Sequence, residues 1–182
     1  MTADELQILH EDNHIIVVVK PQNVASQPDS SGDADMLTLI KEYVRVKCGK
    51  PGNVFIGLVH RLDRPTGGIM VFARTSKAAE RLSAQIREGS FDKRYYAVVM
   101  GRPREKTERL AHYLLKDEET NTTNVVPAST AGCKYAELQY TLIENEGIVS
   151  LVDVRLDTGR SHQIRVQMKT IGNPVFGDAR YG

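Results

Sequence analysis

The residues best suited to chemistry stand between two apolar runs, from His60 to Gly68. This stretch reads His-Arg-Leu-Asp-Arg-Pro-Thr-Gly-Gly, so the carboxylate of Asp63 is flanked by the guanidinium groups of Arg61 and Arg64. Two nearby cations favour the charged carboxylate, which suits a nucleophile or an anion and argues against a general acid. Loops held between strands concentrate binding and catalytic groups. Asp63 is therefore the first candidate for a catalytic residue.

The same charged residues also fit a structural interpretation, an ion pair in a solvated loop. Exposed pairs of this kind contribute only about 0 to 1 kcal/mol to stability. Residue chemistry alone therefore leaves the catalytic and the structural interpretation of Asp63 equally open.

A second group of candidates stands near the C-terminal end of the chain. Apolar residues recur there at helical spacing, with Ser161 as the expected N-cap and Gly172 as the stop. Another face of this short helix carries His162, Arg165 and Lys169. If that face meets the central loop, Arg165 can hold Asp63 in a charge-assisted pair. A surface contact by Arg165 and local packing of His162 are the alternative.

The central stretch from His60 to Gly68, together with motifs at residues 20–21, 93–97, 158–166 and 177–182, forms a collinear series that resembles the motifs of the RluA-type family of RNA pseudouridine synthases. HRLDRPTGG resembles the family signature, and Lys20-Pro21 at the end of an apolar run resembles the opening motif. Lys93-Arg94-Tyr95-Tyr96-Ala97 resembles the K-x-Y-x-A strand. Residues 158–166 resemble the TGR-x-HQIR segment, and residues 177–182 resemble the G-D-x-x-Y-G motif near the end of the family's pattern. The resemblance spans residues 8 to 182, and the order of the motifs favours the catalytic interpretation of the central loop.

The resemblance implies a role for each matching residue. Asp63 is implied to be the essential catalytic carboxylate, and Arg165 to pair with it. Tyr95 is implied to lie against the target base and take part in proton transfer, and Arg61 to enter the RNA where the target nucleotide has left the stack. The other motif residues are implied to bind RNA, namely His60, Arg64, Thr66, Arg160, His162 and Gln163.

The implied reaction converts uridine to pseudouridine. It breaks the bond between N1 and C1′, turns the base and rejoins it through C5, without redox change, so neither a cofactor nor a metal is expected. Asp63 can trap the sugar at C1′ or help to remove a sugar proton, and the sequence leaves both routes open. Extruding the base from structured RNA costs a few kcal/mol. Arg61 suits the gap and Tyr95 suits the stacking.

Length and composition are those of one compact domain over residues 1–182. The chain has a mass of 20.3 kDa and 41% hydrophobic residues, enough for one core. Two cysteines without a Cys-x-x-Cys pattern argue against a zinc site and a disulfide scaffold. Short apolar runs and an acidic start argue against a membrane span and a signal peptide. We expect a soluble, cytoplasmic monomer whose partner is a tRNA or rRNA stem-loop.

Charge is unevenly divided, although the net charge is only +1. Residues 58–102 carry +5 and residues 150–182 carry +2, whereas 1–57 and 103–149 carry −3 each. The positive segments are those that hold the motifs, as expected for a polyanion partner. Ordinary scatter over solvated helix faces also accounts for such an excess.

The elements that must position these residues make an α+β fold, with a mixed, mainly antiparallel sheet and flanking helices. By resemblance this is the pseudouridine synthase catalytic fold. Because members usually continue beyond the final motif, the last C-terminal strands are expected to be missing, replaced or supplied by another arrangement, and no separate N-terminal RNA-binding domain is expected. A polar hairpin loop is expected over 116–132. The strands are expected near residues 6–10, 14–20, 55–60, 68–73, 91–100, 109–115, 133–143 and 147–156, and the helices over 36–48, 75–87 and from 161.

Two other classes of function compete with the enzyme. A non-catalytic RNA-binding or RNA-remodelling module on the same fold is the main alternative, although the intact set of Asp63, Tyr95 and Arg165 argues against it. The His-Arg-Leu-Asp string also resembles a kinase loop, but the chain lacks a glycine-rich phosphate loop and Asp-Phe-Gly. A glycosidase would need a second positioned carboxylate.

Overall fold

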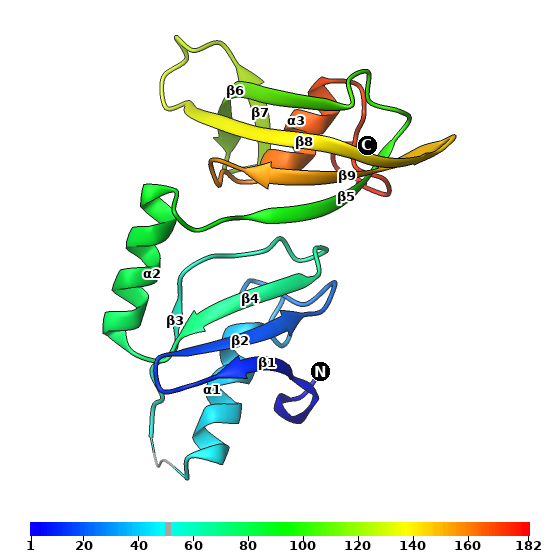
Figure 1. The fold of residues 1–182 in the computed structure, drawn as a ribbon. Helices are drawn as coiled ribbons and strands as arrows, with labels where there is room; N and C mark the ends of the chain where they lie inside the picture. The colour runs from blue at the N-terminus through cyan, green and yellow to red at the C-terminus, as the bar shows by residue number, and fades with distance from the viewer. Residues whose placement is uncertain (50–51) are drawn as a thin grey trace. The chain divides into compact units, whose positions relative to one another are not determined.

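The computed structural model describes residues 1–49 and 52–182. The chain divides into two compact units, Met1–Phe91 and Asp92–Gly182, and each is built on its own antiparallel sheet (Figure 1). Within the residues that the structure describes, three α-helices accompany the sheets. The predicted α+β class is confirmed, whereas a single catalytic domain over residues 1–182 stays a prediction.

The first unit holds a four-stranded sheet in the order β1-β2-β4-β3. Its elements are η1 (Ala3–Glu5), β1 (Gln7–Glu11), β2 (Ile15–Lys20), α1 (Met36–Lys47), β3 (Gly57–Leu58), β4 (Gly68–Ala73) and α2 (Ser76–Glu88). Thr75 caps α2 by accepting from the amide of Ala78, and Gly89 ends it in the left-handed conformation. The strand expected over 55–60 is confined to β3.

The core of the first unit follows from the alternation along β2. Ile16 and Val18 point inward, where they lie opposite Phe72 and Met70 of β4 in the antiparallel register, and none of these four is exposed. Lys20 has the same orientation at the end of the strand. The apolar side of α1 supplies the other buried side chains, Met36, Leu39, Ile40 and Val44.

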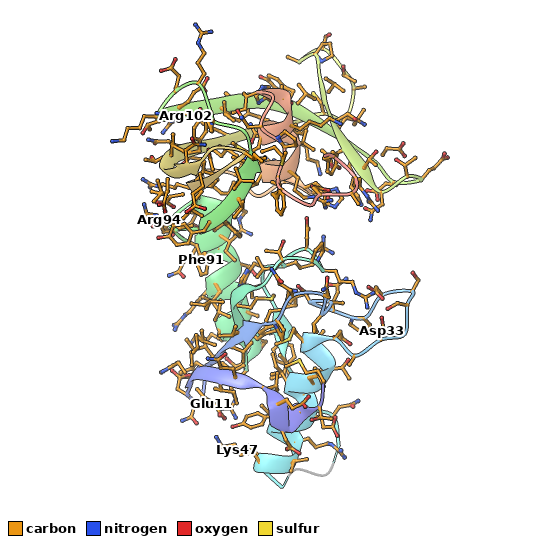
Figure 2. The ribbon with its side chains drawn as sticks, turned by 90° about the vertical axis from the view of Figure 1, so that its right-hand side faces the viewer. Glu11, Asp33, Lys47, Phe91, Arg94 and Arg102 are labelled. Atoms are coloured by element: carbon orange, nitrogen blue, oxygen red, sulfur yellow. The ribbon has the colours of Figure 1, made fainter. Side chains whose placement is uncertain are left out.

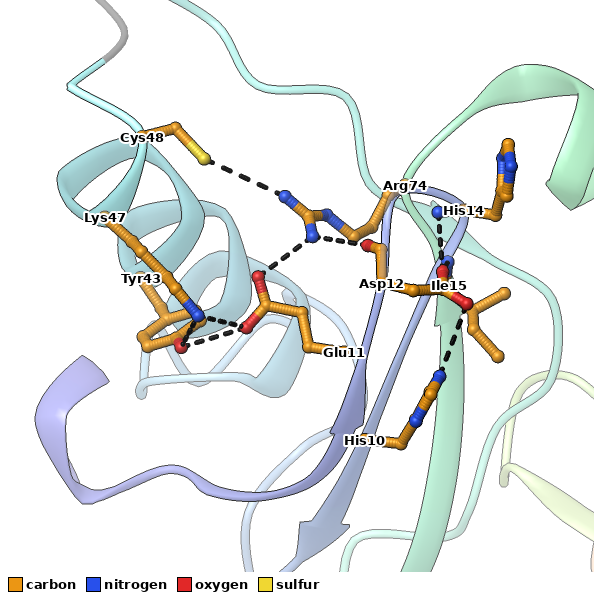
Figure 3. Close-up of polar contacts among 9 residues, drawn as sticks. All are labelled: His10, Glu11, Asp12, His14, Ile15, Tyr43, Lys47, Cys48 and Arg74. Carbon is orange, nitrogen blue, oxygen red and sulfur yellow. Dashed lines mark hydrogen bonds and ion pairs between the residues drawn. The ribbon is translucent and has the colours of Figure 1, made fainter.

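A polar cluster ties α1 to the strands (Figure 3). Glu11 accepts from Tyr43 at 3.0 Å and from Lys47 at 2.7 Å, and its second oxygen accepts from Arg74 at 2.9 Å. Burial would raise the pKa of the Glu11 carboxyl, but the hydrogen bonds from Lys47 and Tyr43 outweigh it and lower that pKa. The cluster fixes the helix that comes after the 21–35 loop.

The second unit holds a five-stranded sheet in the order β5-β9-β8-β6-β7, with α3 beside it (Figure 1). Its elements are β5 (Arg94–Met100), β6 (Thr107–Asp117), β7 (Thr122–Val126), β8 (Lys134–Glu146), β9 (Val149–Leu156) and α3 (Gln163–Thr170). One side of the sheet and Met168 of α3 form the core, whose other buried members are Val99, Leu110, Leu138, Tyr140, Val152 and Val154.

Two sequence expectations in this unit are wrong. The stretch 116–132 is not only a loop, because β7 pairs with the end of β6 from Tyr113 to Asp117. The N-cap of α3 is His162 and not Ser161; it has a left-handed φ of 53° and makes no side-chain cap hydrogen bond. The buried amide of Gln163 serves this helix start instead, accepting from the backbone amide of Arg160 at 2.9 Å.

Candidate active site

The loop that carries Asp63 connects β3 to β4 in the first unit. Asp63 is half-buried, and its carbonyl accepts from the amide of Thr66 at 2.9 Å, which closes a turn across Arg64 and Pro65. The flanking strands belong to the same sheet. The sequence expectation of a charged turn held between two strands is therefore confirmed.

The backbone before Asp63 is fixed by a side chain from the 21–35 loop. Ser26 Oγ donates to the carbonyl of Leu62 at 2.8 Å and accepts from the amide of Leu62 at 3.2 Å. Ser26 and Leu62 are 6% and 9% exposed. Because buried backbone groups must find partners, this one hydroxyl satisfies both polar groups of the residue next to the carboxylate.

The backbone after Asp63 is fixed by a buried cation. Lys20 is fully buried, and its Nζ donates to the carbonyls of Pro21 at 2.9 Å, Val24 at 2.6 Å and Arg64 at 3.1 Å. A protonated amine has three N–H donors, which matches these three acceptors. Burial lowers the pKa of the Lys20 amine to about 8; the Asp63 carboxylate opposes this shift and Arg64 adds to it.

Two glycines allow the loop to approach the end of β2. A Cβ on Gly67 would lie 3.2 Å from Cγ of Gln22 and 3.5 Å from the carbonyl of Lys20. Gly68 has a φ of 148°, which L side chains rarely adopt, and it stands opposite Lys20 in the sheet register. Gly67 therefore lets the loop backbone approach the backbone of Lys20 and Gln22, and Gly68 adopts a conformation that a side chain would strain.

His60 continues the hydrogen bonding of the short strand β3. Its Nε2 accepts from the amide of Val71 at 3.0 Å, and its ring lies 5.8 Å from that of Phe91. Accepting this bond requires an unprotonated Nε2, and burial lowers the pKa of the His60 imidazole. In this structure His60 anchors the loop as a neutral side chain, while the RNA contact expected from the sequence stays a prediction.

The two arginines beside Asp63 differ in their surroundings. Arg64 donates to the carbonyl of Asn23 at 3.2 Å and to Ser31 at 3.1 Å, and it pairs with the carboxylates of Asp29, at 3.5 Å, and Asp33. Arg61 is exposed and has no hydrogen-bond or ion-pair partner within residues 1–49 and 52–182. Arg61 is thus the cation of this loop that the protein leaves available to a ligand.

In the second unit, Tyr95 stands on β5 and packs against the core beneath the sheet. The neighbouring Tyr96 is 77% exposed. The two tyrosines point to opposite sides of the strand, as the alternation predicts. Tyr95 therefore has a ring held by packing, which suits a group that must lie flat against a base.

Arg165 on α3 forms a bidentate ion pair with Asp178. Its Nε and Nη2 donate to the two carboxylate oxygens at 2.6 and 2.7 Å, and the side chain of Asp178 is only 4% exposed. Burial would raise the pKa of the Asp178 carboxyl, but the Arg165 hydrogen bonds and the backbone amides of Arg180 and Tyr181 lower it to about 2. Pairing of Arg165 with Asp63 joins residues of different units and stays a prediction.

Tyr181 contacts both Arg165 and His162. The Arg165 Cζ lies 4.8 Å from the Tyr181 ring centroid, a cation–π contact. The Tyr181 hydroxyl lies 2.8 Å from His162 Nδ1 and accepts from the amide of Thr123 at 2.7 Å. The last motif of the chain therefore orients two residues of the HQIR segment, one by charge and one by a hydrogen bond.

Gln163 holds the loop that precedes α3. It is 3% exposed, and its oxygen accepts from Thr158 Oγ1 at 2.8 Å and from the Arg160 amide, while its nitrogen donates to the carbonyl of Glu137 at 3.0 Å. Arg160 is exposed and donates through Nε to the carbonyl of Tyr135 at 2.8 Å. Direct contact of either side chain with RNA stays a prediction.

The structure gathers the predicted residues into two groups. His60, Arg61, Asp63, Arg64 and Thr66 share one loop of the first unit, and Tyr95, Arg160, His162, Gln163 and Arg165 belong to the second. Sequence reasoning gave no role to four residues that fix these groups, namely Lys20, Ser26, Asp178 and Tyr181. Lys20, Asp178 and Tyr181 stand inside the sequence motifs, and this position is the sequence signal that could have indicated their importance. Ser26 stands in a stretch predicted only as a loop.

Neither a metal cluster nor a membrane-spanning helix is found within residues 1–49 and 52–182. In that part of the chain, no three His, Cys, Asp or Glu side chains cluster in a way that could hold a metal ion. None of its helices has the length and apolar character required to cross a bilayer. The first unit offers a carboxylate with an exposed arginine in the same loop, and the second unit separately offers a packed tyrosine and an arginine held by a carboxylate.

Comparison with known proteins gives a family match over most of the chain. Residues 14–170 match the family model described as RNA pseudouridylate synthase. A "Ribosomal large subunit pseudouridine synthase D" of Zymomonas mobilis is 35% identical over 181 residues, which cover 97% of this chain and 56% of that protein. A "Ribosomal large subunit pseudouridine synthase C" of Vibrio cholerae is 34% identical over 178 residues, covering 96% and 52%. The chain thus spans about half the length of these curated relatives.

Two solved human structures have the same fold. "RNA Pseudouridylate Synthase Domain Containing 4" superposes with a TM-score of 0.84 at 22% identity, covering 99% of this chain and 71% of that one. "RNA Pseudouridylate Synthase Domain Containing 1" superposes with a TM-score of 0.79, also at 22% identity, covering 100% and 71%. At this identity the likeness concerns the fold alone.

Proposed function

The chain belongs to the RNA pseudouridylate synthase family, and from this we propose that it isomerises specific uridines of structured RNA to pseudouridine. The observation that carries the proposal is the family match over residues 14–170, a range that includes Asp63, Tyr95 and Arg165. The geometry around Asp63 supports it, since a serine and a buried lysine hold the backbone on either side of the carboxylate.

We assign Asp63 as the catalytic carboxylate. The reaction breaks the N1–C1′ bond and forms a C5–C1′ bond; the proton on C5 is lost and one is gained at N1, so no external oxidant or reductant takes part. Asp63 acts either by attack on C1′ or by removal of a sugar proton. Holding its backbone on both sides limits the motion of the carboxylate, which favours a reactive geometry in either route.

The other assignments concern the same two groups of residues. Tyr95 lies against the base and takes part in proton transfer, and Arg165 orients the carboxylate as well as binding Asp178. Arg61 fills the space that the extruded nucleotide leaves, which its exposure supports. The RNA-facing residues are His60, Arg64, Thr66, Arg160, His162 and Gln163, of which Gln163 acts through the loop that carries Arg160.

The names of the bacterial relatives make large-subunit ribosomal RNA the first substrate to test, with tRNA as the second. We also propose a cytoplasmic protein that works as a monomer without metal or cofactor. The test is a pseudouridine map of total RNA from cells with and without this protein, repeated with an Asp63→Asn copy.

The enzyme assignment requires that one or a few sites vanish without the protein and return only with the unsubstituted copy. If the Asp63→Asn copy restores pseudouridine at these sites, Asp63 is not the catalytic carboxylate. If purified wild-type protein binds transcribed RNA but converts no uridine in it, the chain is a binding module on this fold.

A further inference from the structure

The loop that joins β5 to β6 carries cations at alternate positions. Arg102, Arg104 and Lys106 are all exposed, whereas Pro103 between the first two is buried. Figure 2 shows Arg102 at the opposite end of β5 from Arg94. None of these loop residues belongs to the candidate active site.

The three cations line one groove of the second unit. The groove has a volume of about 400 Å³, and its opposite wall comes from Leu142 to Asn145 of β8. β8 has a register irregularity between Leu142 and Glu144, and Ile143 there is 54% exposed. Glu144 also lines the groove, so its charged side chains are three cations and one anion.

The backbone of the loop is fixed from several sides. The amide of Gly101 donates to the carbonyl of Ile148 at 2.7 Å, and the carbonyl of Gly101 accepts from Ser150 Oγ at 2.7 Å. Further along, the carbonyl of Lys106 accepts from the amide of Leu142 at 2.7 Å. A fixed backbone holds the cations near one another before a ligand arrives, which lowers the entropy lost on binding.

The charges of this loop are poorly compensated by the protein. Arg104 approaches Glu105 only at 4.0 Å, and with side chains 96% and 61% exposed this pair contributes little. Within residues 1–49 and 52–182, Arg102 and Lys106 have no carboxylate at ion-pair distance. Some other cations of the second unit have such partners, for example in the pairs Arg94–Asp153, Arg109–Glu137, Lys116–Glu118 and Arg165–Asp178, and what distinguishes the loop is that its cations follow one another at alternate positions.

We propose that this groove binds the phosphodiester backbone of RNA, as a second contact apart from the active-site residues. Guanidinium and ammonium groups are the usual partners of phosphate oxygens. Cations repeated along a fixed loop suit a ligand with repeated negative charges, and RNA is the polyanion that the proposed function brings to the chain. The proposal rests on that function and adds a second place on the protein where the RNA is bound.

The position of the groove determines which kinetic constant it affects. Gly101 stands six residue-to-residue steps of extended chain beyond Tyr95, about 20 Å at ~3.3 Å per step. This exceeds the Debye length of about 8 Å at physiological ionic strength. The cations therefore act on phosphates they touch and not on the reacting base, so their loss should raise KM rather than lower kcat.

The test compares three proteins of the full chain. The groove variant is Arg102→Gln/Arg104→Gln/Lys106→Gln, and the control is Lys77→Gln/Arg81→Gln/Arg87→Gln, which removes the same charge from exposed positions of α2. The probe is in vitro transcribed large-subunit ribosomal RNA, titrated at several salt concentrations. Arg102→Lys/Arg104→Lys keeps the charge and serves as a second control. If the triple glutamine protein does not fold, Arg102→Gln/Lys106→Gln takes its place, with the change in slope reduced in proportion to the two charges removed.

The logarithm of the affinity falls as the logarithm of the salt concentration rises. Loss of three phosphate contacts should make this slope less negative by about 2 to 3. The affinity gap between wild type and groove variant should then narrow roughly 16- to 64-fold between about 50 and about 200 mM salt. The α2 control and the lysine variant should keep the wild-type slope. A groove variant with the slope and KM of the α2 control overturns the groove proposal.

The outcomes also separate the groove from the proposed function. If wild type converts uridines and the groove variant matches the control, the proposal that the groove binds RNA is wrong and the proposed isomerase function is retained. If wild type and the groove variant bind the transcript with the expected difference in slope but wild type converts no uridine in any RNA, the proposed isomerase function is wrong and the RNA-binding groove is retained. Absence of RNA binding by wild type overturns both.

Discussion

Arg165 of α3 donates two hydrogen bonds, at 2.6 and 2.7 Å, to the carboxylate of Asp178, thirteen residues further along the chain. The pair is largely shielded from water, since the two side chains are 20% and 4% exposed. A bidentate pair fixes the plane of the guanidinium as well as its position. The final motif of the chain therefore sets the orientation of the arginine that we propose to serve the catalytic carboxylate.

Replacing Asp178 with Asn should destabilise the second unit. The change removes the charge of the carboxylate that binds Arg165 within the second unit, and breaking a buried pair by removing one partner is costly. We expect the free energy of unfolding to fall by about 2 to 4 kcal/mol, measured by urea denaturation. The control is Asp153→Asn, which removes the partner of the 63% exposed Arg94 and should cost less than about 1 kcal/mol. Equal losses in the two variants would contradict the account of Arg165.

Acid should destabilise the protein through the same carboxyl group. The folded pKa of Asp178 is lowered to about 2 from an ordinary 3.8, so the unfolded state binds the proton first as pH falls. The stabilisation is present above about pH 4 and is lost as pH falls toward 2, with a total of roughly 2 kcal/mol. Urea denaturation between pH 5 and pH 2 should show a shallower pH dependence in Asp178→Asn than in wild type. Parallel curves would mean that Asp178 does not carry this dependence.

Replacing Lys20 with Met should impair turnover more than folding. It removes the donor shared by three carbonyls, one of which belongs to Arg64 beside the proposed catalytic carboxylate. Because a misplacement of about 1 Å can cost roughly 100-fold in rate, we expect kcat to fall about 10- to 100-fold. Faster amide hydrogen exchange over residues 61–66 should accompany the loss of rate.

Turnover should also depend on the protonation of the Lys20 amine, because its pKa is about 8. Above that pH the neutral amine has two N–H donors for three carbonyls. Wild-type turnover should therefore decline as pH rises through 8, whereas the Met variant should lack this step. Lys41→Met, on the exposed side of α1, is the control and should keep both the rate and the step.

Replacing Ser26 with Ala should release the other side of the loop. Both backbone groups of Leu62 lose their partner in a site that is 9% exposed, and an unsatisfied buried group costs about 1 to 3 kcal/mol. We expect a stability loss in this range by urea denaturation, together with a lower kcat. Ser76→Ala, at an exposed position of α2, should change neither quantity. A stable Ser26→Ala protein with full turnover would show that this hydrogen bonding is dispensable.

The sequence predicts the strand that carries Lys20 but not the role of this residue. The continuous apolar run over residues 15–19, bounded by turn residues, is a local signal, and the observed strand agrees with it. Lysine is rarely buried, so its inward position depends on acceptors that only the folded chain assembles. The carbonyl of Arg64, 44 residues away, is one of them. Ser26 was missed for the same reason, because its partner Leu62 lies 36 residues away.

Two further misses have local causes. β7 reads as polar because it is an edge strand with only Thr123 buried, so the apolar alternation of a half-buried strand is absent. The prediction of Ser161 as the cap of α3, the helix that contains Arg165, rested on residue type alone. The chain instead uses the side chain of Gln163, within the helix, to hold the preceding loop. The sequence does place Arg165 on α3, but helical periodicity says nothing about a partner outside the helix.

The two arginines that flank Asp63 should respond differently to replacement by Ala. Arg64 is bound by the 21–35 loop, so Arg64→Ala should loosen that loop, with faster hydrogen exchange there and a stability loss of about 1 kcal/mol. Arg61 is exposed and has no ion-pair partner in the described part of the chain, so Arg61→Ala should leave stability unchanged.

Turnover separates the proposed role of Arg61 from a structural one. If Arg61 fills the gap left by an extruded base, its loss leaves the few kcal/mol of unstacking uncompensated. On the RNA identified by the pseudouridine map, kcat/KM of Arg61→Ala should fall about 10- to 100-fold when the target uridine lies in a hairpin, by the exponential relation of rate to free energy. On a single-stranded fragment of the same sequence the loss should be much smaller, because no stacked pair must be opened. Equal losses on both RNAs would assign Arg61 to general phosphate binding instead of base extrusion.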